Sequence, residues 1–534
     1  MGEIKLLDCT LRDGGYLNEW NFGHDSIVNI YERLVSSRMD IIEVGFLNQN
    51  YDKDMDRTIQ PDSKSLDRIY ENLERGQSLI VGMIDYGTCD IDRLVLCRDS
   101  YLDGIRVIFK KDKRWEAIAF CHEIKNLGYK VFVQAVSITS YSDAELKDLL
   151  ALVNDLEPYA FSLVDTYGLL HKNQLIHYFD LSDQELNPSI GLGYHSHNNF
   201  QLAYANCVEL IERNISRQLL VDGSLYGMGK SAGNAPTELL AMYLNDTGRS
   251  QYKVYHLLEA IDTTILDIRK EIQWGYSFKF FVAASNDCHP NYVSYLMDKK
   301  KLSVKSINEI LENIVPEKKL NYDKDYIEEL YVMFQKRECD DREHRKRLLT
   351  LFRGKKILLI GPGKRVLQNI QRIRDYQKQD QVVSIAVNYI PAACPIDGLF
   401  LSNAKRYVQL SSKLNALDKQ PVLIATSNIT SAGKIFPYSL NYSDLLDEEA
   451  MIVDNPMIMF MRFLKDMEIE GLALAGFDGY TKSESANYVN PNMEHSFSRE
   501  KAQDINRDVV ESIQRLSLNY PFFYLTESLY EETE

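Results

Sequence analysis

The sequence IKLLDCTLRDGGY at residues 4–16 distinguishes between two folds, a closed (β/α)8 barrel and a doubly wound open sheet. Both folds fit the alternation of apolar runs and helical stretches that follows it. The stretch begins with an apolar run, which is typical of a strand buried on both faces of a parallel sheet. A doubly wound open sheet needs a glycine-rich phosphate turn after its first strand. The turn here is LRDGGY, which carries Arg12 and Asp13. The stretch therefore favours a closed (β/α)8 barrel with charged groups in its first loop.

Further apolar runs follow as far as about residue 265, with amphipathic helical stretches between them. They are IIEVGF (41–46), SLIVGMID (78–85), GIRVIFK (104–110), YKVFVQAV (129–136), YAFSLVDT (159–166), IGLGYHSH (190–197) and QLLVDGSLY (218–226). Such an alternation predicts a parallel sheet surrounded by helices. About eight units in roughly 250 residues have the size of a TIM barrel, so we expect an α/β barrel over residues 1–265.

The rest of the chain divides into two parts. Residues 266–350 show helical patterns and no convincing strand, which predicts a helical extension; RKRLL at 345–349 is interpreted as a charged linker. Residues 351–534 carry a second α/β pattern, which predicts a Rossmann-like three-layer domain. Its apolar runs are KKILLI (355–360), VVSIAVNYI (382–390), DGLFLSN (397–403), PVLIAT (421–426), AMIVDN (450–455) and GLALAGFDGY (471–480).

Composition narrows the class of protein. Of 534 residues, 45% are hydrophobic and 26% charged, which is the balance of a folded globular chain. The formal net charge of −16 argues against nucleic acid as a partner. No apolar stretch approaches the roughly 20 residues of a membrane span. The 8 cysteines are scattered without a CxxC pair, so we expect free thiols and a cytoplasmic protein. The oligomeric state stays open, with a homo-oligomer as one expectation.

Two histidines mark a candidate metal site. His195 and His197 lie two residues apart on a predicted strand, so both side chains project from one face at its carboxyl end. Asp13 follows the first strand, which in a closed barrel lies one strand away from the seventh. Asn234, in the turn SAGNAP, could add an amide oxygen. Two imidazoles and a carboxylate suit Mn²⁺, Mg²⁺, Fe²⁺, Co²⁺ or Zn²⁺. The alternatives are hydrogen-bonded histidines and a turn-forming asparagine.

Arg12 and Glu43 are candidate catalytic residues beside that metal site. A fixed guanidinium next to a Lewis-acidic ion can stabilise the negative charge that develops on an enolate in the transition state. Glu43, on the neighbouring predicted strand, can orient Arg12. The alternative is a structural ion pair. Charged groups at several adjacent strand ends are costly to desolvate unless an ion or substrate meets them.

Four separated motifs in residues 1–265 resemble one family. DCTLRDGG, the glutamate of IIEVGF, HSHNN and GMGKSAGNAPTELL are similar to those of the DRE-TIM metallolyases, which include 4-hydroxy-2-oxovalerate aldolase-like and HMG-CoA lyase-like catalytic domains. The resemblance implies a lyase with a divalent metal, Mn²⁺ or Mg²⁺ before Co²⁺ or Zn²⁺. Its ligands would be Asp13, His195 and His197, with Asn234 in some members. The substrates implied are a pyruvate-type 2-oxo acid and an aldehyde, joined or cleaved through a metal-stabilised enolate.

The chain departs from this family pattern in two places. The oxo-acid aldolases carry a histidine base where this chain has Tyr16, so the proton carrier is open between Tyr16 and His24. His24 also suits the start of a helix. The loop YGMGKSAGN lacks the mobile cysteine of the lyase subgroup, which weakens an HMG-CoA lyase assignment. The sequence also allows an acyl-CoA-dependent Claisen synthase on the same barrel, or a non-catalytic scaffold that binds a glycan precursor.

The second α/β domain opens on a possible phosphate turn. Anion binding by backbone amides is typical of a strand that runs through a glycine turn into a helix. Here the turn contains Gly361, Gly363 and Lys364. The motif is neither a full GxGxxG nor a GxxxxGK[ST], so its specificity is low. The domain also faintly resembles Rossmann-like domains related to some sialyltransferases and to a pterin-pyrophosphokinase-like family. This resemblance implies a nucleotide or nucleotide-sugar ligand.

Overall fold

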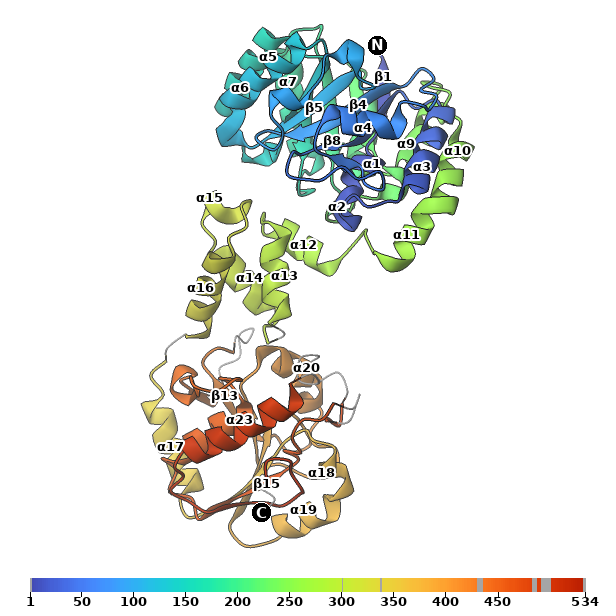
Figure 1. Cartoon of the computed structure of the whole chain (residues 1–534). Coiled ribbons are helices and arrows are strands. Elements are labelled where there is room, and N and C mark those ends of the chain that lie inside the picture. The colour runs from blue at the N-terminus through green and yellow to red at the C-terminus, as the bar shows by residue number, and fades with distance from the viewer. Residues whose placement is uncertain are drawn as a thin grey trace. The chain divides into compact units, whose positions relative to one another are not determined.

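The computed structural model describes residues 2–299, 301–336, 339–429, 436–482, 487–490 and 501–531. The chain forms two compact units (Figure 1). One consists of Met1–Val293 and Lys319–Tyr322, and the other of Ser294–Lys318 and Asp323–Glu534. Within the described ranges, no helix is both long enough and apolar enough to cross a membrane.

Eight parallel strands close into the predicted barrel, and they coincide with the eight apolar runs. The closure is made by β1 (Ile4–Asp8), which pairs with both β2 (Ile41–Leu47) and β9 (Leu219–Gly223). The sheet continues from β2 through β4 (Leu79–Asp85), β5 (Gly104–Phe109), β6 (Lys130–Ala135), β7 (Ala160–Asp165) and β8 (Gly191–Ser196). A two-residue strand, β3 (Ile59–Gln60), pairs with the end of β2. The fold class predicted for this half is confirmed.

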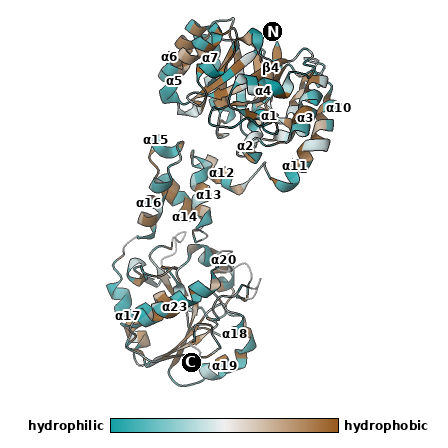
Figure 2. Ribbon diagram, in the orientation of Figure 1, coloured by the Kyte–Doolittle hydropathy of each residue, from teal (hydrophilic) through white to brown (hydrophobic). Residues whose placement is uncertain are grey.

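Amphipathic helices surround the barrel because each buries one apolar stripe against the strands. On α6 (Asp143–Leu156), Leu146, Leu149, Leu150 and Val153 are buried, and a capping box of Ser142 and Glu145 begins the helix. The other long helices are α3 (His24–Ser36), α4 (Ser63–Tyr70), α5 (Arg114–Asn126), α7 (Lys172–Glu185), α8 (Ala203–Glu212), α9 (Thr237–Asp246) and α10 (Val254–Ala260). Figure 2 shows hydrophilic and hydrophobic residues intermixed along these helices, as one buried stripe requires.

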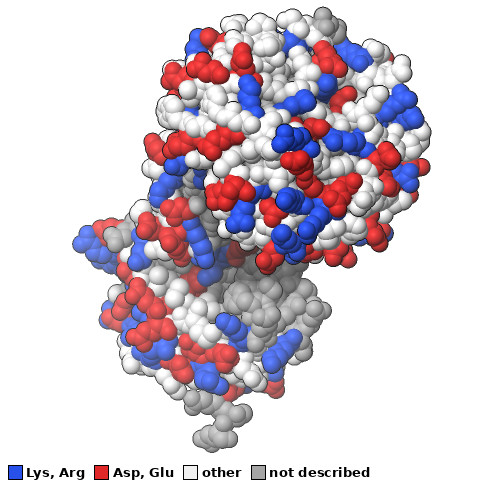
Figure 3. All heavy atoms as spheres, turned by 45° about the horizontal axis from the view of Figure 1, so that its top comes forward, with Lys and Arg blue, Asp and Glu red and all other residues white. Residues whose placement is uncertain are grey.

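Surface charges of both signs are interspersed. On the face drawn in Figure 3, Lys and Arg side chains alternate with Asp and Glu side chains over the described residues. A nucleic-acid backbone would favour clustered cations instead.

Residues 266–350 are helical, as expected, but the predicted linker is wrong. The segment contains α11 (Leu266–Glu271), α12 (Phe278–Ser285), α13 (Pro290–Asp298), α14 (Val304–Glu312), α15 (Pro316–Lys319), α16 (Lys324–Gln335) and α17 (Arg342–Phe352). RKRLL lies inside α17, where Leu348 and Phe352 are buried in the core of the second unit. Its cations line the outer side of a packed helix, so the charge run marks a solvated face.

The second α/β domain is built on seven parallel strands. Their order is β14 (Tyr438–Leu440), β13 (Val422–Thr426), β12 (Gly398–Leu401), β11 (Val382–Val387), β10 (Lys356–Ile360), β15 (Gly471–Ala475) and β16 (Phe522–Tyr524). Because β10 has β11 on one side and β15 on the other, the order reverses beside it. The predicted α/β class is confirmed.

Two apolar layers cover the two faces of this sheet because side chains alternate along each strand. On β10, Ile357 and Leu359 pack with α17, α21 (Pro456–Leu464) and α23 (Ala502–Arg515). Leu358 and Ile360 face the opposite layer, which includes α18 (Arg365–Gln368), α19 (Ile370–Gln377) and α20 (Ala404–Asn415). The run AMIVDN was expected to be a strand; its residues form turns before α21 instead, and β14 and β16 were not foreseen.

Leu348→Ala should destabilise the second unit, because it removes a fully buried side chain from α17. The expected loss is about 2–5 kcal/mol. All three tryptophans, Trp20, Trp115 and Trp274, lie in the first unit. Circular dichroism, which reports on both units, should therefore show an unfolding transition at a lower temperature. Tryptophan fluorescence, which reports on the first unit, should keep its transition unchanged. Leu351→Ala is the control, since Leu351 is 43% exposed on the same helix. Equal effects of the two substitutions would contradict the packing of α17.

Candidate functional site

Asp13, His195 and His197 meet at the carboxyl ends of the barrel strands. One ligand atom from each lies within 4.8 Å of the others, and all three residues are buried. Asp13 ends the short helix α1 (Thr10–Asp13) after β1, while His195 lies in β8 and His197 just beyond it. Barrel closure therefore brings together residues from opposite ends of the barrel sequence.

The loop after β9 holds Asp13 in place. Lys230 donates its backbone N–H to Asp13 Oδ2 at 3.1 Å, and Asn234 donates from Nδ2 to the same oxygen at 2.8 Å. A Cβ on Gly229 would lie 2.4 Å from Asp13 Oδ2 and equally close to Asn234 Nδ2. Glycine is needed there because only a residue without a side chain allows this approach.

The donor set fits a divalent cation. Burial lowers the pKa of His197 to about 3, so its imidazole is neutral at neutral pH. Burial alone would raise the pKa of Asp13, but the Arg12 guanidinium and the hydrogen bond from Asn234 hold it below its usual range. Asn234 Oδ1 is buried and has no hydrogen-bond partner among the described residues. An ion held by Asp13, His195 and His197 would give that orphaned oxygen a partner.

The two imidazoles present the same nitrogen to the cluster. His195 Nδ1 lies 3.0 Å from Asp222 Oδ2, and His197 Nδ1 lies 3.1 Å from the carbonyl oxygen of Lys230. Each contact occupies Nδ1 and leaves Nε2 for a ligand bond. Outer partners of this kind fix the tautomer and orientation of metal-binding histidines.

A buried chain of charges connects Asp13 to His195 around the barrel. Arg12 contacts Asp13 at 2.5 Å and donates to Glu43 at 2.8 Å. Glu43 Oε2 also lies 2.9 Å from Arg106 Nη1 on β5, and Arg106 forms a further ion pair with Asp222, the partner of His195. Three carboxylates here meet two guanidiniums, and His195 stands at the other end of the chain of contacts.

Sequence reasoning missed Arg106 and Asp222. Both occur within apolar strand runs, GIRVIFK and QLLVDG, in which a single charged residue carries no motif. Arg106 is 1% exposed, although long charged side chains rarely become fully buried without partners. A lone charge inside a predicted buried strand was therefore the available signal.

Tyr16 lies beside the cluster, whereas His24 begins a helix. Lys230 Nζ lies 5.1 Å from the centre of the Tyr16 ring, and the ring packs against Trp20. Although the Tyr16 residue as a whole is 37% exposed, burial of its hydroxyl end raises the pKa of that group, so it keeps its proton at neutral pH. This direction is opposite to the one that a phenolate base requires. His24 is the first residue of α3, and its backbone N–H donates to Asp56 Oδ1 at 2.8 Å.

In the second domain, the side chain of Asp478 lies against the glycine turn and takes the place of an external anion. Arg365 donates its backbone N–H to Asp478 Oδ2 at 2.8 Å, and a Cβ on Gly363 would lie 2.5 Å from that carboxylate. The following helix, α18, is only 4 residues long. A phosphate bound by Gly361, Gly363 and Lys364 would be repelled by the Asp478 carboxylate, which lies against this turn. The geometry therefore disfavours the expected phosphate site.

The barrel half of the chain is similar to known proteins. Residues 3–265 match the family model described as HMGL-like. The 4-hydroxy-2-oxovalerate aldolase of Bacillus thuringiensis (strain Al Hakam) is 25% identical over 285 residues, which cover 51% of this chain and 80% of that protein. The enzyme of the same name from Stutzerimonas stutzeri is 23% identical and covers 49% and 77%. The hydroxymethylglutaryl-CoA lyase structure from Pseudomonas aeruginosa is 14% identical, with a TM-score of 0.42, and covers 50% and 92%.

Arg106→Met should destabilise the barrel, because it leaves Glu43 and Asp222 buried without their shared cation. Breaking one partner of a buried ionic network costs about 3–5 kcal/mol. Tryptophan fluorescence during denaturant unfolding measures this loss. Arg33→Met is the control, because Arg33 pairs with Glu259 on the surface and such a pair contributes about 0–1 kcal/mol. An Arg106→Met barrel as stable as the control would show that this network is not structural.

Proposed function

We propose that this chain is a divalent-metal-dependent aldolase that forms or cleaves a pyruvate-type 2-oxo acid, since its residues 3–265 match the HMGL-like family model. The observation that carries the proposal is the meeting of Asp13, His195 and His197 beside the buried, partnerless Asn234 Oδ1 of the described structure. Relatives named 4-hydroxy-2-oxovalerate aldolase support the 2-oxo-acid substrate and an aldehyde as its partner. Residues 1–265 form the catalytic part in this proposal.

Arg12 is the group that we assign to the developing negative charge. Its guanidinium is buried between Asp13 and Glu43, so its position is fixed before substrate binds. A preorganised cation in a dry site stabilises an enolate without reorganising when charge develops. A bound divalent ion, Mn²⁺ or Mg²⁺ if the family resemblance holds, would supply Lewis acidity toward the substrate carbonyl. Glu43 is a positioning residue, because it acts through Arg12.

Tyr16 is better suited to donate a proton than to accept one. In the synthetic direction the aldehyde oxygen gains a proton as the carbon–carbon bond forms, and a protonated phenol near Arg12 and Asp13 can provide it. Cleavage would require the reverse transfer. His24 stays a weaker candidate, because its backbone hydrogen bond to Asp56 serves the start of α3.

Asp13→Asn should abolish metal-dependent turnover and leave the fold intact. The substitution keeps the size of the side chain but removes the charge that the cation needs. Calorimetric titration with Mn²⁺ measures binding, and pyruvate consumption with a panel of aldehydes measures turnover. Arg12→Met is the matched variant: it should bind Mn²⁺ but lose about 10²–10³-fold in kcat. Full activity of Asp13→Asn would refute the ligand set, and activity only with a CoA ester would favour a Claisen synthase.

Tyr16→Phe should lower kcat and leave Mn²⁺ affinity unchanged, because the hydroxyl is assigned to proton transfer and not to the metal. A loss of about 10²–10⁴-fold is expected for a general acid. His24→Gln is the control and should change kcat little. The pH profile of kcat decides between them: loss of activity through a group titrating near neutral pH that disappears in His24→Gln would identify His24 instead.

A further inference from the structure

The loop after β9 places a lysine side chain beside the candidate metal site. Lys230 donates its backbone N–H to Asp13 Oδ2, and its carbonyl oxygen contacts His197 Nδ1. The same carbonyl accepts the backbone N–H of Gly233 at 3.0 Å, and the next residue, Ser231, has a left-handed φ of 60°. Strained backbone that is fixed by several contacts is typical of ligand sites. The loop therefore holds the origin of the Lys230 side chain against two of the three proposed metal ligands.

The positive charge of Lys230 is not compensated by a close acid. Among the described residues, no carboxylate lies within ion-pair or hydrogen-bonding distance of its ammonium group. Its Nζ lies 5.1 Å from the centre of the Tyr16 ring, a contact that attracts the cation but does not neutralise it. Burial lowers the pKa of Lys230, while Asp13 and Asp85 oppose this from beyond contact distance. An anionic ligand would compensate the charge of this partly buried cation.

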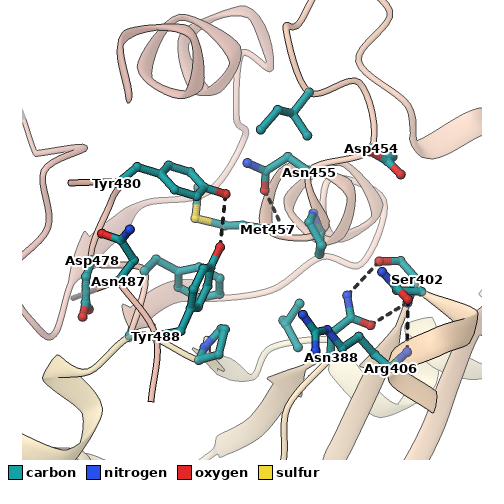
Figure 4. Close-up of a pocket in the computed structure, with 18 of the residues that line it drawn as sticks. Asn388, Ser402, Arg406, Asp454, Asn455, Met457, Asp478, Tyr480, Asn487 and Tyr488 are labelled. Atoms are coloured by element: carbon teal, nitrogen blue, oxygen red, sulfur yellow. Dashed lines mark hydrogen bonds between the residues drawn. The ribbon is translucent and has the colours of Figure 1, made fainter. Parts of the chain in front are cut away.

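Two comparable lysines in the second unit do have acid partners. They line a cavity of about 490 Å³ at the carboxyl ends of β10, β11, β12 and β15. Lys301 pairs with Asp454, which Figure 4 shows in the cavity wall, and Lys299 Nζ lies 2.8 Å from Glu328 Oε2. All three lysines are partly buried. A difference in exposure therefore does not explain why Lys230, alone of the three, lacks an acid partner among the described residues.

The other charged and titratable groups near Lys230 leave its charge in place. Burial, together with the charge of Lys230, lowers the pKa of His289 to about 4, so that imidazole is neutral at neutral pH. Burial raises the pKa of Asp85, at the end of β4, and the charges of Lys110 and Lys230 oppose this rise. Asp85 forms an ion pair with neither lysine among the described residues. This end of the barrel therefore offers positive charge to a ligand.

We propose that the Lys230 ammonium binds the carboxylate of the 2-oxo acid substrate and so selects acids over uncharged carbonyl compounds. This inference rests on the proposed function, in which the substrate carbonyl lies at the ligand cluster. The carboxylate of a 2-oxo acid is bonded directly to the carbonyl carbon, so it lies close to Asp13 and His197, where the loop places Lys230. Lysine suits this role because it presents three donors on a compact charge. Arg12 keeps its separate role toward the enolate.

Calorimetric titration of the full chain in the presence of Mn²⁺ tests this assignment. The probes are pyruvate and pyruvamide, which has nearly the same shape but no charge. Lys230→Gln should bind pyruvate about 10- to 100-fold more weakly than the unmodified chain, because it loses a hydrogen bond to a charged group. It should bind pyruvamide nearly as before, and Lys230→Arg should lose less because it keeps the charge. Undiminished pyruvate binding by Lys230→Gln, or an equal loss for pyruvamide, would overturn the assignment.

Two controls separate a direct contact from structural and long-range effects. Lys230→Gln keeps the backbone groups that contact Asp13 and His197, so it should bind Mn²⁺ as tightly as the unmodified chain. Lys110→Gln removes an equal charge from an exposed residue directly after β5 and should leave pyruvate binding unchanged. Loss of Mn²⁺ binding in Lys230→Gln would assign Lys230 to the metal site instead. A loss of pyruvate binding in Lys110→Gln as large as in Lys230→Gln would show that only the net charge matters, which also refutes the contact.

Binding and turnover together separate this inference from the aldolase proposal. If the unmodified chain binds pyruvate more tightly than Lys230→Gln does but converts no aldehyde, the aldolase proposal fails and the Lys230 assignment stands. If the chain is an aldolase and Lys230→Gln keeps the KM and Kd for pyruvate, the assignment fails and the aldolase stands. Absence of pyruvate binding by the unmodified chain up to ~10 mM would overturn both.

Discussion

The buried chain of charges from Asp13 through Arg12, Glu43, Arg106 and Asp222 to His195 is the constraint on which the barrel site depends. Each member is costly to remove from water and becomes tolerable only with its neighbours in place. The members come from α1, which follows β1, and from β2, β5, β8 and β9. The network therefore requires the barrel to close, and once closed it fixes the side chains that face the candidate metal site.

The Asp13 carboxylate at the end of this network gives the candidate metal site its anionic ligand. Three carboxylates and two guanidiniums lie in the chain of contacts, and Asp13 stands at its end beside the imidazoles of His195 and His197. A cation bound there would compensate the buried carboxylate and give Asn234 Oδ1 a partner. Arg12 keeps Asp13 ionised, and in the proposed reaction it would also stabilise the negative charge that develops on the substrate.

The second domain pairs the buried polar groups at its strand ends with one another. Asp478 accepts the backbone N–H of Arg365 after β10, and Asn388 exchanges two hydrogen bonds with Ser402 across two strand ends. Asp478, Asn388 and Ser402 line the cavity of this domain. The cavity and the candidate metal site of the barrel therefore both lie at the carboxyl ends of parallel strands, which is where such sheets bind ligands.

Local sequence determined the strands and helices of both domains to a large extent. Apolar runs such as GIRVIFK and KKILLI had to be buried, and their spacing predicted the barrel and the second sheet. The sequence also brought out Arg12, Asp13, His195 and His197, because these charged or chelating residues stand directly at strand ends. It misjudged RKRLL, whose charges mark one face of α17, and AMIVDN, whose apolar residues lie in turns.

Only the tertiary structure decided which of these residues act together. Arg106 and Asp222 joined the site because barrel closure places their strands beside those of Glu43 and His195. Asp478 follows β15 and lies against the glycine turn after β10, because these two strands are neighbours in the sheet although they are far apart in sequence. Its carboxylate disfavours the phosphate that the turn alone suggested. A sequence pattern reports what one segment prefers, whereas partners of buried charges are chosen by strand order, which no single segment contains.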